Sequence, residues 1–425
     1  MVSTIATVGV GALLARLLSP NAFGAYVLAA SMVVVSSVAA ELGLRQAAVP
    51  LIAKPLVLGD TGRARAAIRA VIRLSVIGAV VGGAILAAGA GAWIAENVFG
   101  SPLLASVSWL IAVWVVSITI QNVLSGVFRG LHDIRLATVF EGLASGSLTA
   151  IVLLVMWVTV GHATLEPVLA LSVAASVASL SLAGVLMWRR IHSLEPGSRL
   201  DLRGVLSFTW PMGVTGLAIF AVTTWTDVWI IGAFLGQREV ALYGAAVRLA
   251  ALVAAPALVL HSVAPPLIAE LHARGDRPQL QRALQIATAW LSLPSIALFL
   301  LFAALGSSIL GVVYGPTYGQ ASDVMVVLSV GYLGIMLVGP CGDALTMTGY
   351  QKLMMVITIA TGAVSFLAGL ALVGPFGVLG VAAATTGGIL AQVLLLLWFV
   401  KRRLGIWTQA RFAPREMLDL FWPRA

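Results

Sequence analysis

Residues 50–60 read PLIAKPLVLGD, and residues 266–276 read PLIAELHARGD. The two stretches share Pro-Leu-Ile-Ala at the start and Gly-Asp at the end, and they lie 216 positions apart in a chain of 425 residues. The second stretch therefore occupies nearly the same place in the second half of the chain as the first does in the first half. This spacing predicts a duplicated architecture.

Two further pairs of stretches support the duplication. LLSPNAFGAY (17–26) and FLGQREVALY (234–243) both end in tyrosine, at an offset of 217. FRGLHDIR and MTGYQKLM align Gly130 with Gly349, at an offset of 219. The alternative is that Gly-Asp simply makes a good turn after an apolar helix. That alternative does not explain three pairs in order at a nearly constant offset.

The composition predicts a membrane protein. Hydrophobic residues make up 60% of the chain and charged residues only 10%, with a mean hydropathy of +1.04, whereas soluble domains carry about 25% charged residues. The apolar runs are long enough for helices that span a bilayer, and they lack the alternating polarity of barrel strands. We interpret the first run as a short helix rather than a signal peptide. The twelve predicted spans are 2–18, 22–44, 72–94, 104–127, 137–160, 165–188, 205–233, 240–263, 283–305, 322–346, 351–373 and 376–400.

The basic residues are distributed asymmetrically among the connections between these spans. Of the 25 Lys and Arg residues, 22 follow even-numbered helices, and the odd-numbered connections hold only Arg238. Cytoplasmic connections carry the excess of positive charge in membrane proteins. The pattern therefore predicts that both termini and all even-numbered connections are cytoplasmic.

We expect three segments along the chain. Residues 1–200 form an N-terminal six-helix lobe with its cytoplasmic connection, residues 201–404 form a C-terminal six-helix lobe, and residues 405–425 form a cytoplasmic tail. Because six is even, both lobes enter the membrane from the same side, and the repeats are parallel. The tail mixes aromatic and basic residues, which suits an amphipathic segment on the membrane surface but also a poorly ordered chain end.

The opening pair of stretches is predicted to form two cytoplasmic turns, which we call elbows. Each elbow connects an even-numbered helix to the helix that follows it. Gly59 and Gly275 allow a tight turn after an even-numbered helix. Asp60 and Asp276 follow these glycines and are suited to cap the next helix.

Two arginines within the predicted spans are candidates for binding an anion. Arg16 and Arg248 come from different halves and lie at similar outer depth, and guanidinium groups suit phosphate recognition. A charge in the membrane is costly and usually faces a cavity or a partner. The alternatives are that Arg248 pairs with Asp227 in a structural ion pair, or that Arg16 extends to the outer interface.

Three carboxylates lie nearer the predicted inner ends of the spans. Glu41, Glu141 and Asp343 are candidates for coupling transport to a proton or another ion. The alternative is an interfacial or structural role for each of them.

The chain lacks the common motifs of enzymes and metal sites. No G-x-x-x-x-G-K-[ST], H-E-x-x-H or G-x-S-x-G is present, and Cys341 is the only cysteine. We therefore expect no catalytic residues, no cofactor, no metal site and no internal disulfide. The net charge of +9 is explained by the cytoplasmic connections, so it does not indicate a nucleic-acid partner.

Several long stretches resemble a known family. They are ARLLSPNAFGAYVLA (15–29), AELGLRQAAVPLIA (40–53), the segment from TWTDVW to HARGD (224–276) and the segment from GPTYGQ to TMTG (315–349). Together they are similar to Wzx-type polysaccharide-biosynthesis flippases of the multidrug/oligosaccharidyl-lipid/polysaccharide exporter (MOP) superfamily.

The resemblance implies a twelve- or fourteen-helix, V-shaped exporter fold that works by alternating access. It also implies movement of an undecaprenyl-pyrophosphate-linked oligosaccharide from the inner to the outer leaflet of the bacterial cytoplasmic membrane, for O-antigen or exopolysaccharide synthesis. Cavity arginines of the family are thought to meet the pyrophosphate. Arg16, Asp227 and Arg248 fall in the matching stretches, and we add the paired Tyr26 and Tyr243 to the predicted substrate-binding set. The expected partners are the lipid-linked oligosaccharide, membrane lipids and a glycan polymerase or export machinery.

Other functions remain open at this point. A multidrug cation antiporter of the same superfamily is expected to have an acidic, aromatic cavity, and the arginine pair argues against it. A membrane glycan polymerase or ligase is expected to carry a large outer loop, which the sequence lacks. A scaffold protein without catalytic activity, within a polysaccharide assembly complex, is also compatible with the sequence.

Overall fold

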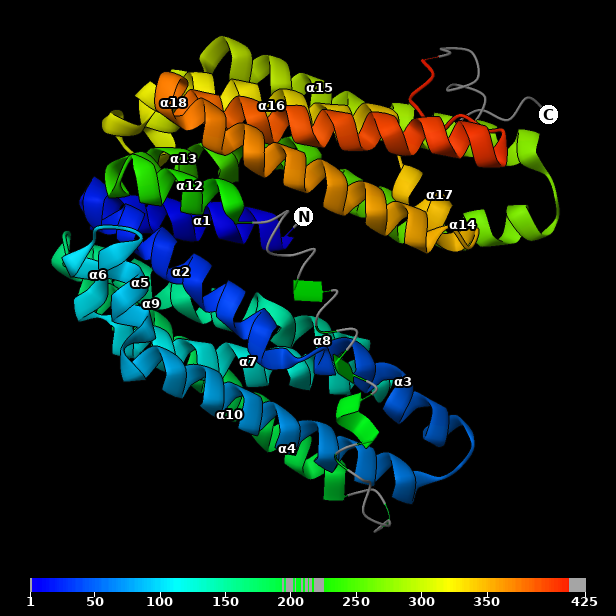
Figure 1. The fold of residues 1–425 in the computed structure, drawn as a ribbon, viewed down its shortest axis with the longest axis horizontal. Coiled ribbons are helices and arrows are strands. Elements are labelled where there is room, and N and C mark those ends of the chain that lie inside the picture. Colours follow the sequence, from blue (N-terminus) through cyan, green and yellow to red (C-terminus); the bar gives the residue numbers. More distant parts are fainter. Residues whose placement is uncertain are drawn as a thin grey trace. The chain divides into compact units, whose positions relative to one another are not determined.

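The computed structural model describes residues 2–192, 195, 202, 204–207, 209–210, 213, 216–217 and 225–412. Every regular element among these residues is a helix (Figure 1), which confirms the predicted all-α class. The chain divides into two units, which we describe separately. The N-terminal unit comprises Gly9–Ala241, and the C-terminal unit comprises Leu242–Ala425 together with Met1–Val8. The predicted boundary after residue 200 falls where few residues are described, and it remains a prediction.

The N-terminal unit is built around α7, which packs against α2, α3, α4 and α10. Pro20 occupies the first turn of α2, and the Ser19 side chain caps that helix by accepting the Ala22 N–H, a common way to begin a helix. The elements are α1 (Val2–Leu17, which belongs to this unit from Gly9 onwards), α2 (Pro20–Glu41), α3 (Leu44–Val57), α4 (Thr61–Ile85), η1 (Leu86–Ala90), α5 (Gly91–Asn97), α6 (Pro102–Ser106), α7 (Ser108–Gly130), α8 (Ile134–Thr138), η2 (Val139–Leu143), α9 (Ala144–Val160), α10 (Leu165–His192) and α12 (Thr226–Phe234).

The C-terminal unit contains the remaining helices, and α16 packs against both α15 and α18. The chain bends by 42° between the segments 237–254 and 257–273, next to Pro256, which is the N-cap residue of the second segment. The elements are α13 (Gln237–Ala250, which belongs to this unit from Leu242 onwards), η3 (Ala251–Ala254), α14 (Ala257–Ala273), α15 (Arg277–Tyr314), η4 (Pro316–Ala321), α16 (Ser322–Val338), α17 (Cys341–Met347) and α18 (Gln351–Leu404).

Eight helical segments in the described residues are long and apolar enough to cross a membrane, or nine if the bent pair is counted as one span. The first predicted span appears as a shorter apolar helix, Ala6–Leu17. The predicted span 205–233 lies mostly outside the described residues. The number of twelve spans therefore remains a prediction, whereas the multi-pass character of the protein is clear.

The helix α18 folds back on itself and accounts for two predicted spans. Gly377 interrupts it with a φ of 57°. The Ser365 hydroxyl donates to the carbonyl of Ala384 at 3.0 Å, and the Gln392 amide donates to the Thr358 hydroxyl, also at 3.0 Å. In a straight helix the members of these pairs would be roughly 28 and 51 Å apart. The two arms are therefore antiparallel, as the separate runs 351–373 and 376–400 predict.

The two elbows of the opening repeat have the same backbone geometry. Gly59 and Gly275 adopt φ values of 77° and 75°. Asp60 (φ −86°, ψ 76°) and Asp276 (φ −84°, ψ 76°) each cap the next helix by accepting the N–H three residues on, at 2.7 and 3.0 Å. The N–H of each aspartate also donates to the carbonyl five residues back, at 2.9 and 3.2 Å. The predicted turns and caps are confirmed in both halves.

The third pair of the repeat needs a correction. The sequence comparison aligned Gly130 with Gly349, but the residue with a positive φ at the first of these elbows is His132 (φ 60°), which matches Gly349 (φ 88°). The residue after each of them, Asp133 or Tyr350, again donates its N–H to the carbonyl five residues back, at 3.0 and 2.8 Å. The offset between His132 and Gly349 is 217, in agreement with the other pairs. The match of Gly130 to Gly349 was wrong because His132 adopts the left-handed conformation that glycine usually favours.

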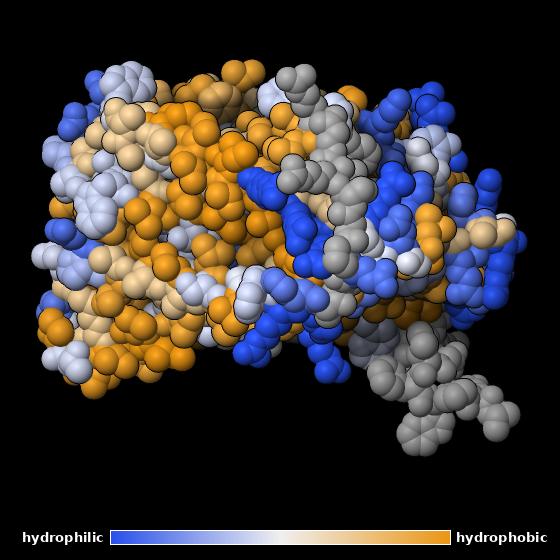
Figure 2. Space-filling model, turned by 90° about the horizontal axis from the view of Figure 1, so that it is seen from below, coloured by the Kyte–Doolittle hydropathy of each residue, from blue (hydrophilic) through white to orange (hydrophobic). Residues whose placement is uncertain are grey.

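Large apolar side chains are exposed along the spans. Val158 and Val312 are 73% and 72% exposed, and such exposure is normal for residues that face lipid. Figure 2 shows hydrophobic residues over a wide part of one face, with hydrophilic residues gathered mainly towards one end. This distribution fits a protein whose surface lies in hydrocarbon for part of its length.

Candidate substrate site and inner charge cluster

Arg16 lies in the last turn of α1, with an exposed side chain. Its guanidinium carbon lies 5.9 Å from the centre of the Trp157 ring, near the end of α9. The Leu17 carbonyl accepts the N–H of Ala163 at 2.9 Å, so this end of α1 is held against the loop that follows α9. The contact with the ring face stabilises the cation. It also orients the guanidinium at the surface of the N-terminal unit.

Tyr26 and Tyr243 are buried, with exposed fractions of 6% and 0%. In the N-terminal unit, the Tyr26 hydroxyl donates to Ser172 Oγ at 3.1 Å, and its ring lies 5.9 Å from that of Trp114. Tyr26 therefore links α2 to α7 and α10. Contact of either tyrosine with substrate remains a prediction.

Asp227 and Arg248 lie in different units. The Asp227 carboxylate accepts the N–H of Val228 at 2.8 Å in the first turn of α12. Arg248 donates to the carbonyl of Gly244 at 2.7 Å in the last turn of α13. The joint action of Arg16 and Arg248 on an anion remains a prediction, and the ion pair between Asp227 and Arg248 remains its alternative.

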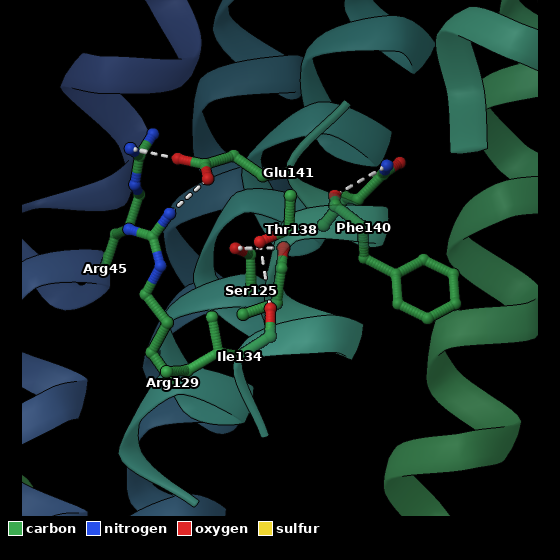
Figure 3. Close-up of polar contacts among 9 residues, drawn as sticks. Arg45, Ser125, Arg129, Ile134, Thr138, Phe140 and Glu141 are labelled. Carbon is green, nitrogen blue, oxygen red and sulfur yellow. Dashed lines mark hydrogen bonds and ion pairs between the residues drawn. The ribbon is translucent and has the colours of Figure 1, made fainter. Parts of the chain in front are cut away.

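A cluster of charges that the sequence did not group together surrounds Glu141. Arg45 Nη2 lies 2.8 Å from Glu141 Oε1, and Arg129 Nη2 bonds Oε2 of the same carboxylate (Figure 3). The side chains of Arg45, Arg129 and Glu141 are 33%, 39% and 30% exposed. One carboxylate from η2 thus joins α3 to the end of α7. We call these three residues the inner charge cluster.

Glu41 lies close to this cluster but has a different partner. It is only 4% exposed, and its Oε1 accepts the amide of Asn122 at 2.7 Å. The positive charge of Arg45 acts on the Glu41 carboxylate. A buried carboxylate requires such compensation, because its desolvation without partners is costly. Glu41 and Glu141 therefore share the electrostatic environment of Arg45.

The helix that carries Glu141 is broken one residue later. Gly142 has a φ of 143° within the π-helical turn η2. The break displaces backbone carbonyls from the regular helical pattern, and side chains of α7 accommodate two of them. Gln121 donates to the Phe140 carbonyl at 2.9 Å, and Ser125 donates to that of Ala137 at 3.0 Å (Figure 3). Short π-helical segments are frequent at functional sites.

Asp343 belongs to the C-terminal unit and pairs with His261. The His261 Nδ1 and Asp343 Oδ2 atoms lie 2.5 Å apart, and the side chains are 47% and 24% exposed. His261 lies 216 positions after Arg45, which is the offset of the opening repeat. The two halves thus place a basic side chain at equivalent positions, and each pairs with an acid of its own unit.

The described residues contain no group of three or more His, Cys, Asp or Glu that could hold a metal ion. Glu41, Glu141 and Asp343 are paired with asparagine, arginine and histidine, respectively. This arrangement compensates the charge of each carboxylate.

Two models of known protein families match parts of the chain. A family model described as polysaccharide biosynthesis protein matches residues 1–272, which is more than half of the chain. The chain belongs to the polysaccharide biosynthesis protein family. A second model, MatE, matches residues 211–369. No curated protein matches the chain in sequence.

Solved structures show which fold this member of the polysaccharide biosynthesis family adopts. A multidrug resistance MATE family transporter of the MOP superfamily in an inward-facing conformation aligns with a TM-score of 0.77 at 15% identity, over 95% of this chain and 94% of the other. The lipid II flippase MurJ in an inward closed conformation aligns with a TM-score of 0.64 at 16% identity, over 99% and 88%. A MOP superfamily transporter from Pyrococcus furiosus aligns with a TM-score of 0.63 at 15% identity, over 95% and 92%. The chain therefore has the fold of MOP superfamily transporters.

Proposed function

We propose that the protein moves an undecaprenyl-pyrophosphate-linked oligosaccharide from the inner to the outer leaflet of the bacterial cytoplasmic membrane, by alternating access. The observation that carries this proposal is the match of the polysaccharide biosynthesis model to residues 1–272. That stretch includes Arg16, Asp227 and Arg248. The fold shared with a lipid flippase and with other transporters supports transport rather than catalysis.

The chemistry of such a substrate explains why a protein is needed. The glycan and pyrophosphate would lose their hydration in hydrocarbon, at a cost of several kcal/mol for each unpaired polar group. A polyprenyl chain, in contrast, is stable among acyl chains. A transporter therefore has to shield only the headgroup, and it needs cationic side chains for the pyrophosphate.

In this proposal Arg16 and Arg248 bind the pyrophosphate, and Asp227, Tyr26 and Tyr243 shape the site around them. The exposed guanidinium of Arg16, oriented by Trp157, supports its assignment. Glu41, Glu141 and Asp343 are the candidates for coupling, because each carboxylate has a polar or basic partner whose bond a proton would change. We place both termini in the cytoplasm and expect the product to reach a glycan polymerase or export machinery.

Multidrug cation export is the second candidate function. The MatE model matches residues 211–369, and the MATE transporter aligns with a TM-score of 0.77. A cation antiporter is expected to bind organic cations, which the arginines proposed here would repel.

Reconstitution into sealed vesicles tests the proposal. Vesicles with the protein are expected to expose a fluorescent prenyl-pyrophosphate glycan on the opposite leaflet at least about tenfold faster than empty vesicles, a difference of roughly 1.4 kcal/mol in barrier height. The same vesicles are expected not to move ethidium under a proton gradient. Ethidium transport without glycan flipping would instead establish the antiporter.

A further inference from the structure

One face of the second arm of α18 is exposed up to the end of the helix. Leu394, Leu395 and Trp398 are 57%, 42% and 50% exposed. The half-buried Lys401 and the exposed Arg402 follow them on the same face. With 3.6 residues per turn, these five side chains fall within about 120° of one another around the helix axis. The face therefore changes from apolar to basic along its length, at the point where the last predicted span ends.

The opposite side of this arm packs inside the C-terminal unit. Leu396, Val400 and Leu404 are buried, and all three belong to one hydrophobic core cluster. They centre about 160° away from the middle of the exposed face. The exposed face is therefore turned away from this core, and its large apolar side chains suit contact with lipid.

An aromatic ring orients each of the two basic groups. The Arg402 guanidinium carbon lies 5.1 Å from the centre of the Trp398 ring, and the Lys401 Nζ atom lies 5.1 Å from that of Trp407. Trp407 is held in turn by its N–H, which donates to the Gln281 side chain at 2.9 Å. A ring face stabilises a cation. The two rings thereby fix the positions of two positive charges beside each other at the end of the helix.

The charges of these two groups are not compensated within the part of the chain that the structure describes. Neither Lys401 nor Arg402 forms an ion pair there, and Lys401 donates instead to the Gly405 carbonyl at 3.3 Å. The end of α10 is different, because Arg190 lies 3.0 Å from the carboxylate of Asp133. The end of α18 therefore presents two oriented positive charges next to exposed apolar surface.

The depth of these groups matches the headgroup layer of a bilayer. Trp398 and Arg402 are separated by about 6 Å along the helix axis, and the headgroup layer on each side of a bilayer is about 5–8 Å thick. Tryptophan is enriched at this boundary, and basic groups next to a span attract anionic lipids. The order of leucine, tryptophan and basic residue thus follows the order of acyl chain, interface and phosphate.

We propose that the exposed face of Leu394, Leu395, Trp398, Lys401 and Arg402 binds an anionic glycerophospholipid. The two basic groups bind its phosphate, and its acyl chains lie along the two leucines. A zwitterionic phospholipid binds less tightly, because the two basic groups repel its ammonium group. This inference does not depend on the substrate that the protein transports.

Mass spectrometry of the intact protein under non-denaturing conditions tests this preference. The full-length protein in detergent is titrated with dioleoyl phosphatidylglycerol or with dioleoyl phosphatidylcholine, which have the same acyl chains. We expect the first phosphatidylglycerol to bind at least about fivefold more tightly, which is the effect of one charge near the membrane surface. The double variant Lys401→Gln/Arg402→Gln is expected to lose this preference.

Arg403→Gln is the matched control for the double variant. It removes a neighbouring charge that lies about 140° from the middle of the exposed face, where the Arg403 guanidinium carbon is 5.7 Å from the centre of the Tyr350 ring. We expect this control to keep the preference of the wild type. The proposal is overturned if the wild type binds both lipids equally, or if the double variant keeps the preference.

Fluorescence quenching in vesicles locates the lipid. In a Cys341→Ser background, a bimane fluorophore is attached to Leu395→Cys or to the control Leu367→Cys, an exposed position on the other arm of α18. The vesicles contain equal amounts of phosphatidylglycerol and phosphatidylcholine, and one of the two lipids carries bromine on its acyl chains. The ratio of quenching by brominated phosphatidylglycerol to quenching by brominated phosphatidylcholine is expected to be several-fold higher at Leu395→Cys than at Leu367→Cys. Lys401→Gln/Arg402→Gln is expected to abolish this difference.

Two results of the quenching experiment would contradict the site. Equal ratios at the two labelled positions would show that no anionic lipid is enriched at the end of α18. Weak quenching by both lipids at Leu395→Cys alone would show that protein, rather than lipid, covers this face.

Discussion

Replacement of Gly126 by leucine is expected to prevent the N-terminal unit from folding. Gly126 and Gly130 face α3 from the last turns of α7. A Cβ atom at Gly126 would overlap the carbonyl oxygen of Arg45 and lie 3.2 Å from its carbonyl carbon. Because the obstacle is backbone rather than a flexible side chain, α3 and α7 would have to separate. Overpacking of this kind costs about 1–3 kcal/mol or more, and small residues at this spacing are typical of close helix contacts in membranes.

The yield of monodisperse protein in detergent and its thermal unfolding temperature measure this effect. Gly184→Leu on α10 is the matched control, since no atom lies within 4 Å of a Cβ built there. We expect near wild-type behaviour for the control and loss of folded protein for Gly126→Leu. Similar yields for the two variants would show that the α3–α7 contact is not close.

Replacement of Glu141 by glutamine is expected to weaken the inner charge cluster. The amide keeps the size of the side chain but removes the charge that pairs with Arg45 and Arg129. Two partly buried arginines would then face each other without a carboxylate. Hydrogen bonds to charged groups contribute about 1.5–3 kcal/mol each, so we expect the free energy of unfolding to fall by about 2 kcal/mol.

An exposed ion pair provides the control for Glu141. Glu270 and Arg274 lie 2.7 Å apart on α14, with side chains 56% and 67% exposed. Glu270→Gln is expected to change stability by less than about 0.5 kcal/mol, because such surface pairs contribute little. Unfolding temperatures in one detergent compare the two variants. If Glu270→Gln lowers the unfolding temperature as much as Glu141→Gln does, the inner charge cluster contributes no more stability than an exposed ion pair.

The sequence allowed the repeated elbows to be predicted because turn chemistry is local. Gly59, Asp60 and their counterparts in the second half act through their own backbone and the next few residues. The same locality explains why the two arms of α18 were visible as separate apolar runs. The alignment of Gly130 with Gly349 was wrong because it matched one glycine to another. The residue of the first half that shares the left-handed conformation of Gly349 is His132.

The partners of Glu141 were not predictable in the same way. Arg45 lies 96 residues away from Glu141 along the chain. The sequence identified it only as one of many basic residues in the predicted cytoplasmic connections. Arg129 is 12 residues away, on a different helix. Their meeting depends on how α3, α7 and η2 pack, which no local pattern encodes. Arg16 was identified from its depth and its family-like surroundings, but its stacking on Trp157 required the fold.

The central claim is that Arg16 binds the pyrophosphate of a lipid-linked glycan during flipping. The most direct measurement is the flipping rate of a fluorescent prenyl-pyrophosphate glycan in vesicles with the wild type, Arg16→Ala or Arg238→Ala. Loss of a charge-assisted contact of about 1.5–3 kcal/mol predicts a rate roughly 10–100-fold lower for Arg16→Ala. Arg238→Ala, which removes an exposed arginine from α13, is expected to flip at the wild-type rate. Equal rates for all three proteins, or flipping no faster than in empty vesicles, would contradict the claim.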